Sequence, residues 1–284
     1  MHRPPDGPDA PEAELTPAPR IPRSLLFVPG GRADMIAKAP RPGPDAIAVD
    51  LEDAVAADAK DTARTTALEN LPDHGGLVLV RVNAPGTPWY DDDVAVVAGS
   101  AAGVVLPKYE DRAQLHALRD AVGDRPVIVG IETGRGVARV RELLEGAEVT
   151  AAYFGAEDYI ASVGGRRTAS SAEVLFARSE VLLAARVGGV GALDQAVVNV
   201  RDEAFFRTDA AAGRDLGYDG KICIHPTQVT LAHEVFTPSD AEVEHARRVV
   251  EAGRSAGVGV VDGEMVDDVH LRMAAAILAK VGEA

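Results

Sequence analysis

Three carboxylates stand together at the end of an apolar run near residue 50. The segment DAIAVDLED (45–53) reads as a buried strand, and Asp50, Glu52 and Asp53 lie where that strand would leave the core. Carboxylates crowded into one concavity repel one another and resist desolvation, so they need a compensating charge. A bound divalent cation would supply that charge.

Polar residues also follow most of the other strand-like runs. In chain order they are Arg81, Asn83, Lys108, Glu132, Glu157, Asp158 and His225. If the strands are parallel, their carboxyl ends meet at one edge, and these side chains meet there with the acids near residue 50.

Glu132 and Asp158 are the pair best placed to hold a metal. They follow consecutive strand-like runs, so they would approach one point from adjacent strands. Mg²⁺ is usually held by one or two carboxylates plus waters and substrate oxygens, which suits two protein ligands. The acids near residue 50 could then bind the metal's waters. The alternative is that each carboxylate caps a helix or pairs with an arginine or lysine.

Arg81 and His225 each have a functional and a structural interpretation. An arginine inside a barrel mouth can hold an oxyanion or carboxylate, which we favour for Arg81, or it can neutralise nearby acids. For His225, which precedes a proline at a strand end, we favour a structural role. The glycine-containing loops FVPGGR and VGGRRT lack the full spacing of a nucleotide-binding fingerprint.

Short β-branched runs alternate with longer amphipathic stretches along the chain, which predicts parallel strands joined by helices. About eight such units close naturally into a (β/α)₈ barrel, a TIM barrel, and the alternative is an open doubly wound sheet. We favour the barrel, since polar residues end nearly every run. The predicted strands are 23–30, 45–53, 76–83, 103–108, 125–133, 150–158, 193–200 and 218–226.

Composition limits the class of protein. With 284 residues, 46% of them hydrophobic, the chain can bury one large core, so we expect one barrel domain over 23–284. Residues 1–22 are rich in proline and alanine and show no apolar period, which predicts a disordered tail. The single cysteine, Cys223, cannot pair within the chain and is expected to pack in the core.

Charge and hydropathy limit the partners. The net charge of -15 disfavours nucleic acid and an anionic membrane as partners, because binding phosphate needs a basic surface. No apolar run is long enough to span a bilayer, and the N-terminus lacks the layout of a secretory signal. We therefore expect a soluble, cytoplasmic protein.

In order and spacing, a set of segments resembles the citrate lyase beta subunit-like proteins of the HpcH/HpaI aldolase superfamily, which also holds malyl-CoA and citramalyl-CoA lyases. The resemblance runs from about Pro22 to the C-terminus. The segments are RSLLFVPGGR, AVDLEDAV, VRVN, LPK, IETGRG, FGAEDY, LFARSEVLLAAR, GYDGKICIHPTQ and GEMVD.

The resemblance implies a Mg²⁺-dependent (β/α)₈ barrel that breaks or forms a carbon–carbon bond in a 3-hydroxyacyl-CoA thioester. It implies that Glu132 and Asp158 hold the metal and that Arg81 contacts the oxygen on which charge develops. Breaking the bond would leave a thioester enolate. Asp267, in a C-terminal lid (about 236–284) that reaches a neighbouring subunit, would protonate this enolate. A capping role for Asp267 at the following helix is the alternative.

Further implied residues complete the expected site. Glu52 and Asp53 are expected to act beside the metal, and Phe27, Pro29, Arg32 and Lys38 would line the channel for coenzyme A. Because the lid needs a neighbour, a homo-oligomer, either trimer or hexamer, is expected.

The sequence departs from the family pattern at Asn199 and Ser162, where relatives often carry an acid, and it lacks a proline after Asp267. These departures leave the substrate open. The alternatives to an acyl-CoA lyase are an aldolase of free hydroxy-oxo acids, a citrate lyase beta-type subunit acting on a carrier-protein thioester, and a catalytically silent subunit.

Overall fold

Eight parallel strands close into a barrel in the computed structural model, which describes residues 21–256 and 259–283. The strand order is β1 to β8, and β1 pairs with β8 to complete the ring. The closed ring confirms the predicted (β/α)₈ barrel over the open sheet. The strands are β1 (Ser24–Pro29), β2 (Ala46–Asp50), β3 (Leu77–Arg81), β4 (Gly103–Leu106), β5 (Val127–Ile131), β6 (Ala151–Phe154), β7 (Gly191–Asp194) and β8 (Gly220–Cys223).

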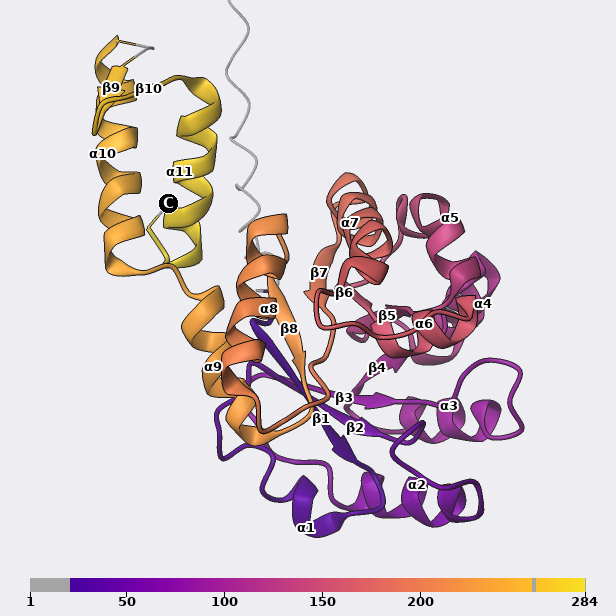
Figure 1. Ribbon diagram of the computed structural model, residues 1–284. Helices are drawn as coiled ribbons and strands as arrows, with labels where there is room; N and C mark the ends of the chain where they lie inside the picture. Colours follow the sequence, from indigo (N-terminus) through magenta and orange to yellow (C-terminus); the bar gives the residue numbers. More distant parts are fainter. Residues whose placement is uncertain (1–20, 257–258, 284) are drawn as a thin grey trace, which may run out of the picture.

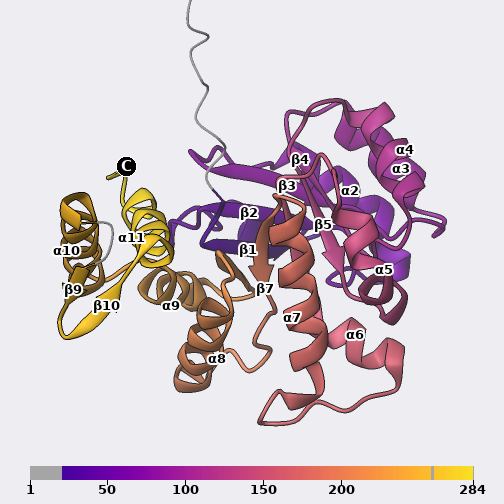
Figure 2. The same cartoon turned by 90° about the horizontal axis from the view of Figure 1, so that it is seen from above.

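Helices follow the strands and surround the barrel (Figures 1 and 2). They are α1 (Ala33–Ile36), the 3₁₀ turn η1 (Ala57–Ala59), α2 (Lys60–Glu69), α3 (Tyr90–Ala98), α4 (Arg112–Val122), α5 (Gly134–Leu144), α6 (Ala156–Val163), α7 (Ala172–Val187), α8 (Glu203–Leu216) and α9 (Pro226–Phe236).

Alternating side chains of the strands fill two cores. Inward-facing residues such as Leu79, Val105 and Ile128 fill the barrel interior and are fully buried. The outward-facing residues, such as Val80 and Val104, pack against the helices. A filled interior leaves the carboxyl ends of the strands as the place for a ligand.

The seventh strand differs from the prediction. The sequence predicts a strand over 193–200, but β7 ends at Asp194, and Val198 is exposed in the loop that follows. The β-branched run AVVNV has strand-like composition, yet it lies beyond the last residue that pairs with β6 and β8. Tertiary pairing therefore overrode local preference.

The start of the described chain belongs to the barrel. Ile21 packs against the interior core and Pro22 is buried, although both lie inside the predicted tail. Residues 1–20 of that tail lie outside the described residues.

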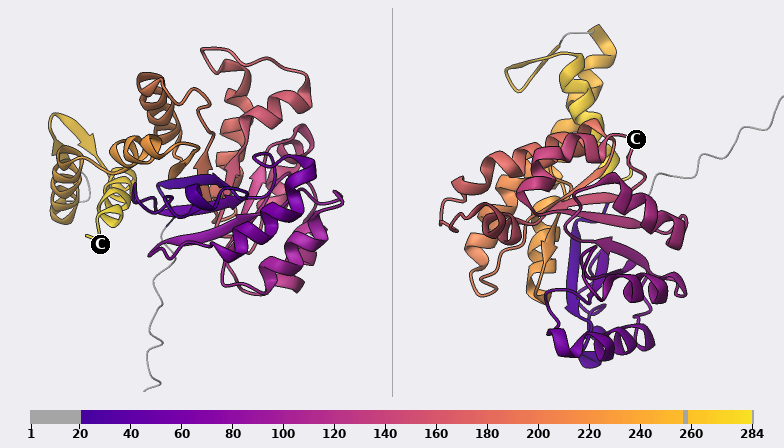
Figure 3. Two further views of the ribbon diagram at one scale, coloured as in Figure 1. Left: turned by 90° about the horizontal axis from the view of Figure 1, so that it is seen from below. Right: turned by 90° about the vertical axis from the view of Figure 1, so that its right-hand side faces the viewer.

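The last part of the chain forms a separate unit beside the barrel, which we call the C-terminal unit (239–283). It holds α10 (Asp240–Ala256), the hairpin β9 (Gly259–Val261) and β10 (Glu264–Val266), and α11 (Asp268–Lys280). Its own apolar cluster includes Val249, Val261 and Ala274. Figures 1 and 3 show that α10 leads away from the barrel and α11 returns, with the hairpin at the far end.

No helix within the described residues is long and apolar enough to cross a membrane.

Candidate active site

A cavity of about 350 Å³ opens at the carboxyl ends of the strands. Most of the predicted mouth residues line it, including Asp50, Asp53, Arg81, Glu132 and Asp158. Phe27 and Pro29, expected in the coenzyme A channel, line it as well. Parallel strands thus bring together residues that are far apart in sequence.

Glu132 is held by two hydrogen bonds at the end of β5. The backbone N–H of Lys108 donates to its Oε1 at 2.7 Å, and the Tyr153 hydroxyl donates to its Oε2 at 2.8 Å. Glu132 as a whole is 2% exposed, and burial raises the pKa of its carboxyl group. Gly155 leaves it room, because a Cβ there would lie 2.5 Å from Glu132 Oε2.

Asp158 lies in the first turn of α6 and lines the same cavity as Glu132. Its Oδ1 is 3.4 Å from the Lys108 ammonium, and it is more exposed than Glu132. Neither acid is paired with an arginine among the described ion pairs, and both line the same cavity.

Arg81 forms a two-point pair with Asp50. Its Nε and Nη2 donate to the two carboxylate oxygens, each at 2.7 Å. Asp50 also accepts the N–H groups of Glu52 and Ala54. Burial opposes ionisation of Asp50, but the charge of Arg81 and these hydrogen bonds outweigh it and lower its pKa. Asp50 therefore orients Arg81, a role that differs from the expected contact with metal-bound water.

Glu52 is a second buried acid of the site whose pKa is raised. Burial raises its pKa to about 8, with added repulsion from Glu132 and Asp53, against the attraction of Arg81 and Lys108. Oε1 accepts a hydrogen bond from the Lys108 ammonium at 2.6 Å. Oε2 is 3.1 Å from Arg81 Nη1, yet it accepts no hydrogen bond from a described residue. A buried oxygen without a hydrogen-bond partner calls for an explanation, and a water or ion bound beside it would supply one.

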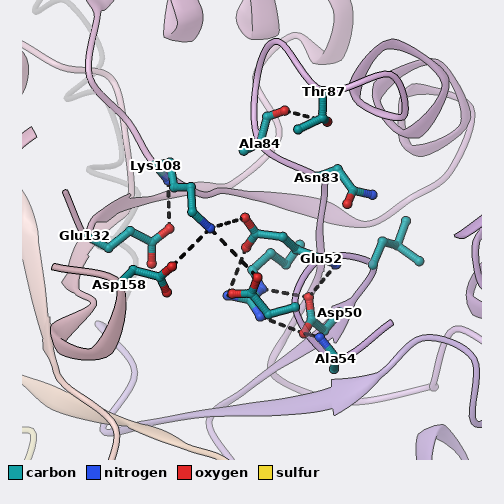
Figure 4. Close-up of polar contacts among 12 residues, drawn as sticks. Asp50, Glu52, Ala54, Asn83, Ala84, Thr87, Lys108, Glu132 and Asp158 are labelled. Atoms are coloured by element: carbon teal, nitrogen blue, oxygen red, sulfur yellow. Dashed lines mark hydrogen bonds and ion pairs between the residues drawn. The ribbon is translucent and has the colours of Figure 1, made fainter. Parts of the chain in front are cut away.

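Lys108 links the two halves of the acid cluster, as Figure 4 shows. Its ammonium lies between Glu52 and Asp158. Burial disfavours the charged amine, but the charge and hydrogen bond of Glu52 outweigh this and raise its pKa.

The residues of the site fit a hard divalent cation. Among the described residues, five carboxyl groups (Asp50, Glu52, Asp53, Glu132 and Asp158) gather around Arg81 and Lys108, so acidic groups outnumber basic groups by three. All available donors are oxygens, the ligands that Mg²⁺ prefers. No cluster of three or more acidic, histidine or cysteine side chains in the described part of the chain is arranged around one metal position. Glu132 and Asp158 would thus hold a cation with waters or substrate oxygens completing its shell.

Several predicted residues lie away from the cavity lining. Arg32 and Lys38 are exposed beside α1, and both pair with Asp34. The position of Asp267 agrees with the capping interpretation: its carboxylate accepts the N–H groups of Val269 and His270 at the start of α11.

Asp267 also lies far from the cavity of its own chain. It begins α11 beside the hairpin, at the end of the C-terminal unit farthest from the barrel (Figure 1). The other end of α11, at Ala279 and Lys280, lines a groove with Ile21 and Arg23 at the start of β1, which is the barrel end opposite the mouth.

Two other predicted mouth residues are structural. Asn83 turns toward α3 and donates to Asp93 at 2.6 Å. His225 caps α9 through its ring nitrogen, which accepts the N–H of Thr227, as we favoured from the sequence. Cys223 is buried, as expected.

Sequence reasoning missed two buried residues. Tyr153 was hidden inside a strand, where an aromatic residue signals only packing. Lys60 donates to the carbonyls of Leu51 and Glu52 at 2.8 and 2.6 Å, and so fixes the loop that carries the acids. Its place at the start of an amphipathic helix gave no signal.

Comparison with known proteins decides the family. The profile of the HpcH/HpaI aldolase/citrate lyase family matches residues 23–226. The chain belongs to this family. It is 46% identical to a citrate lyase subunit beta-like protein of Deinococcus radiodurans, over 92% of this chain and 98% of the relative. It is 38% identical to a (3S)-malyl-CoA thioesterase of Cereibacter sphaeroides, over 91% and 94% of the two chains.

A solved structure is similar to this chain in both fold and sequence. It is the protein CitE from Mycobacterium tuberculosis, in complex with magnesium, acetoacetate and coenzyme A. The TM-score is 0.83 at 34% identity, covering 93% of this chain and 99% of that one. The family is thus one of aldolases and lyases, with a member that binds magnesium and coenzyme A.

Proposed function

We propose that this protein is a Mg²⁺-dependent carbon–carbon lyase, or a Claisen-type synthase in the reverse direction. Its substrate is a 3-hydroxyacyl-CoA thioester such as citramalyl-CoA or malyl-CoA, and its products are acetyl-CoA and a 2-oxo acid. The observation that carries the proposal is the gathering of Glu132, Asp158 and Arg81 around one cavity with an excess of carboxylates.

Each residue has a defined task in this reaction. Glu132 and Asp158 hold the cation, which when bound supplies Lewis-acid stabilisation of the oxo-acid oxygens. The substrate hydroxyl passes its proton to an ionised carboxylate of the cluster or to water, and its carbon becomes the oxo carbon of the 2-oxo acid. The carbon–carbon bond breaks, and its electrons pass to the thioester as an enolate. Arg81, oriented by Asp50, stabilises the developing negative charge. Phe27 and Pro29 form the apolar side of the entrance.

Protonation of the enolate calls for a second copy of the chain. Asp267 is far from its own cavity, so as the proton donor it would have to enter the cavity of a neighbour. Exposed apolar side chains on the same unit, Val260, Met265, Val269 and Met273, offer a surface for that contact. We therefore infer a homo-oligomer, a trimer or hexamer.

Arg32 and Lys38, exposed near the mouth, would contact the phosphates of coenzyme A.

Calorimetry with Mg²⁺ tests the metal site. We expect the wild type to bind Mg²⁺ and Glu132→Ala to lose most of the affinity, because one of two protein ligands is gone. Glu203→Ala, at an exposed glutamate on α8, serves as the control and should bind as the wild type does. Equal binding by wild type and Glu132→Ala would reject the site.

A substrate screen tests the reaction. Citramalyl-CoA, malyl-CoA and 3-hydroxy-3-methylglutaryl-CoA are offered with Mg²⁺, and the products are identified. Release of acetyl-CoA with pyruvate or glyoxylate supports the lyase. Turnover of free hydroxy-oxo acids alone would select the aldolase instead, and turnover that requires an acyl carrier protein would select the carrier-dependent subunit.

A further inference from the structure

Lys108 has a backbone conformation that residues with a side chain rarely adopt. Its φ angle is +49°, in the left-handed region that favours glycine. In this conformation its N–H points at Glu132 Oε1 and donates to it at 2.7 Å. Such a conformation persists where surrounding contacts impose it, commonly at functional sites.

The side chain of Lys108 reaches the other acids of the site. Its ammonium is 2.6 Å from Glu52 Oε1, 3.4 Å from Asp158 Oδ1 and 3.9 Å from Asp53 Oδ1 (Figure 4). The side chain is 29% exposed, so solvent and salt screen these attractions less than at an open surface. One residue therefore contacts both proposed metal ligands, Glu132 through its backbone and Asp158 through its charge.

These two contacts have opposite consequences for a bound cation. The backbone hydrogen bond fixes the direction of the Glu132 carboxylate and so favours binding. The ammonium attracts the same Asp158 carboxylate that a cation needs, and two cations at one carboxylate repel each other. A cation bound at Asp158 must therefore share its carboxylate with the Lys108 ammonium, or displace that ammonium so that it contacts Glu52 but not Asp158.

We propose that Lys108 is a positioning residue that sets the metal affinity of the site: its backbone amide orients Glu132, while its ammonium holds Glu52 near Asp158 and competes with a divalent cation for Asp158. The proposal rests on the proposed metal site. It adds that the charge of Lys108 lowers the Mg²⁺ affinity of the proposed pair Glu132 and Asp158, so that Mg²⁺ binds reversibly.

Mg²⁺ titration calorimetry on the full-length chain tests the proposal. In Lys108→Met the repulsion is gone and the backbone N–H remains, so we expect the dissociation constant for Mg²⁺ to fall about tenfold. Lys108→Arg restores the charge and should bind close to the wild type. Lys280→Met, on α11 at the far end of the barrel, is the control and should leave binding unchanged.

Thermal unfolding gives a second readout. Without Lys108 the acids repel one another, so Mg²⁺ should raise the melting temperature of Lys108→Met more than that of the wild type. If Lys108→Met does not fold without Mg²⁺, the measurement is repeated with Lys108→Gln. A variant that folds only when Mg²⁺ is present supports the proposal.

The outcomes separate the two claims. Equal or weaker Mg²⁺ binding by Lys108→Met, or failure of both variants to fold even with Mg²⁺, overturns the role of Lys108. A wild type that binds no Mg²⁺ rejects the metal site itself.

Discussion

Single residues control the site through the room they leave as well as the groups they supply. A Cβ at Gly155 would lie 2.4 Å from Glu132 Cβ, and one at Gly130 would lie 2.3 Å from the Tyr153 hydroxyl. Both glycines thus make space for the hydrogen bond between Tyr153 and Glu132. The orientation of Glu132, a proposed metal ligand, therefore depends on the lack of a side chain at Gly130 and Gly155.

Substitution Gly155→Ala tests this dependence. The added methyl group displaces Glu132, so we expect weaker Mg²⁺ binding and about a 100-fold loss of turnover, because small misplacements are costly in catalysis. Calorimetry and steady-state kinetics measure both. Gly75→Ala is the matched control, since a Cβ at Gly75 meets nothing within 4 Å. Normal metal binding by Gly155→Ala would show that Glu132 is free to move.

His233, at the barrel end opposite the mouth, makes the stability of the fold depend on pH. Its Nε2 is 2.8 Å from Ser24 Oγ, and burial, then the charge of Arg23, lower its pKa below the usual value of 6.5 against the attraction of Asp45. The unfolded chain therefore takes up this proton at higher pH than the folded chain. Stability from this residue is present above about pH 6.5 and is lost as the pH falls through the lower folded pKa.

We expect the melting temperature of the wild type to fall more between pH 7 and pH 5 than that of His233→Gln, which cannot titrate. Scanning calorimetry across this range measures the difference. Parallel curves for the two proteins would contradict the lowered pKa.

Secondary-structure elements combine support and function in the C-terminal unit. Asp267 forms a capping box with His270 at the start of α11, which satisfies backbone N–H groups that the helix leaves unpaired. The proposed acid is thus also the residue that fixes the helix end. The two roles require different chemistry, so they can be separated.

Asparagine caps a helix but cannot donate a carboxylic proton. We expect Asp267→Asn to keep stability near the wild type and to lose most turnover, whereas Asp267→Ala loses turnover and about 1 kcal/mol of stability as well. Chemical denaturation and kinetics on both variants check this. Full turnover by Asp267→Asn would leave Asp267 with the cap alone.

The whole molecule places its proposed groups on two separate bodies. The barrel holds the carboxylates and Arg81, while Asp267 and the exposed Met265 and Met273 belong to the C-terminal unit. Since this unit docks by the barrel end opposite the mouth, one chain does not complete the proposed site.

A charge on the exposed face of α11 should weaken contacts between copies. We expect Met273→Asp to lower the mass seen by light scattering toward that of one chain and to reduce turnover in parallel. Val96→Asp, at a partly exposed position on α3, is the control. A wild type that is monomeric and fully active would remove Asp267 from the mechanism.

Local sequence determined the barrel and the pair of proposed ligands. Alternation of apolar runs and amphipathic stretches specifies strands and helices, and parallel strands must place Glu132 and Asp158 at one mouth whatever the details of packing. Only the tertiary structure decided how these groups are held. Lys108 meets Glu52 across 56 residues and Arg81 meets Asp50 across 31, and both contacts depend on barrel closure and register. Likewise, the end of β7 and the distance of Asp267 from the mouth follow from strand pairing and the docking of α11, which no local pattern encodes.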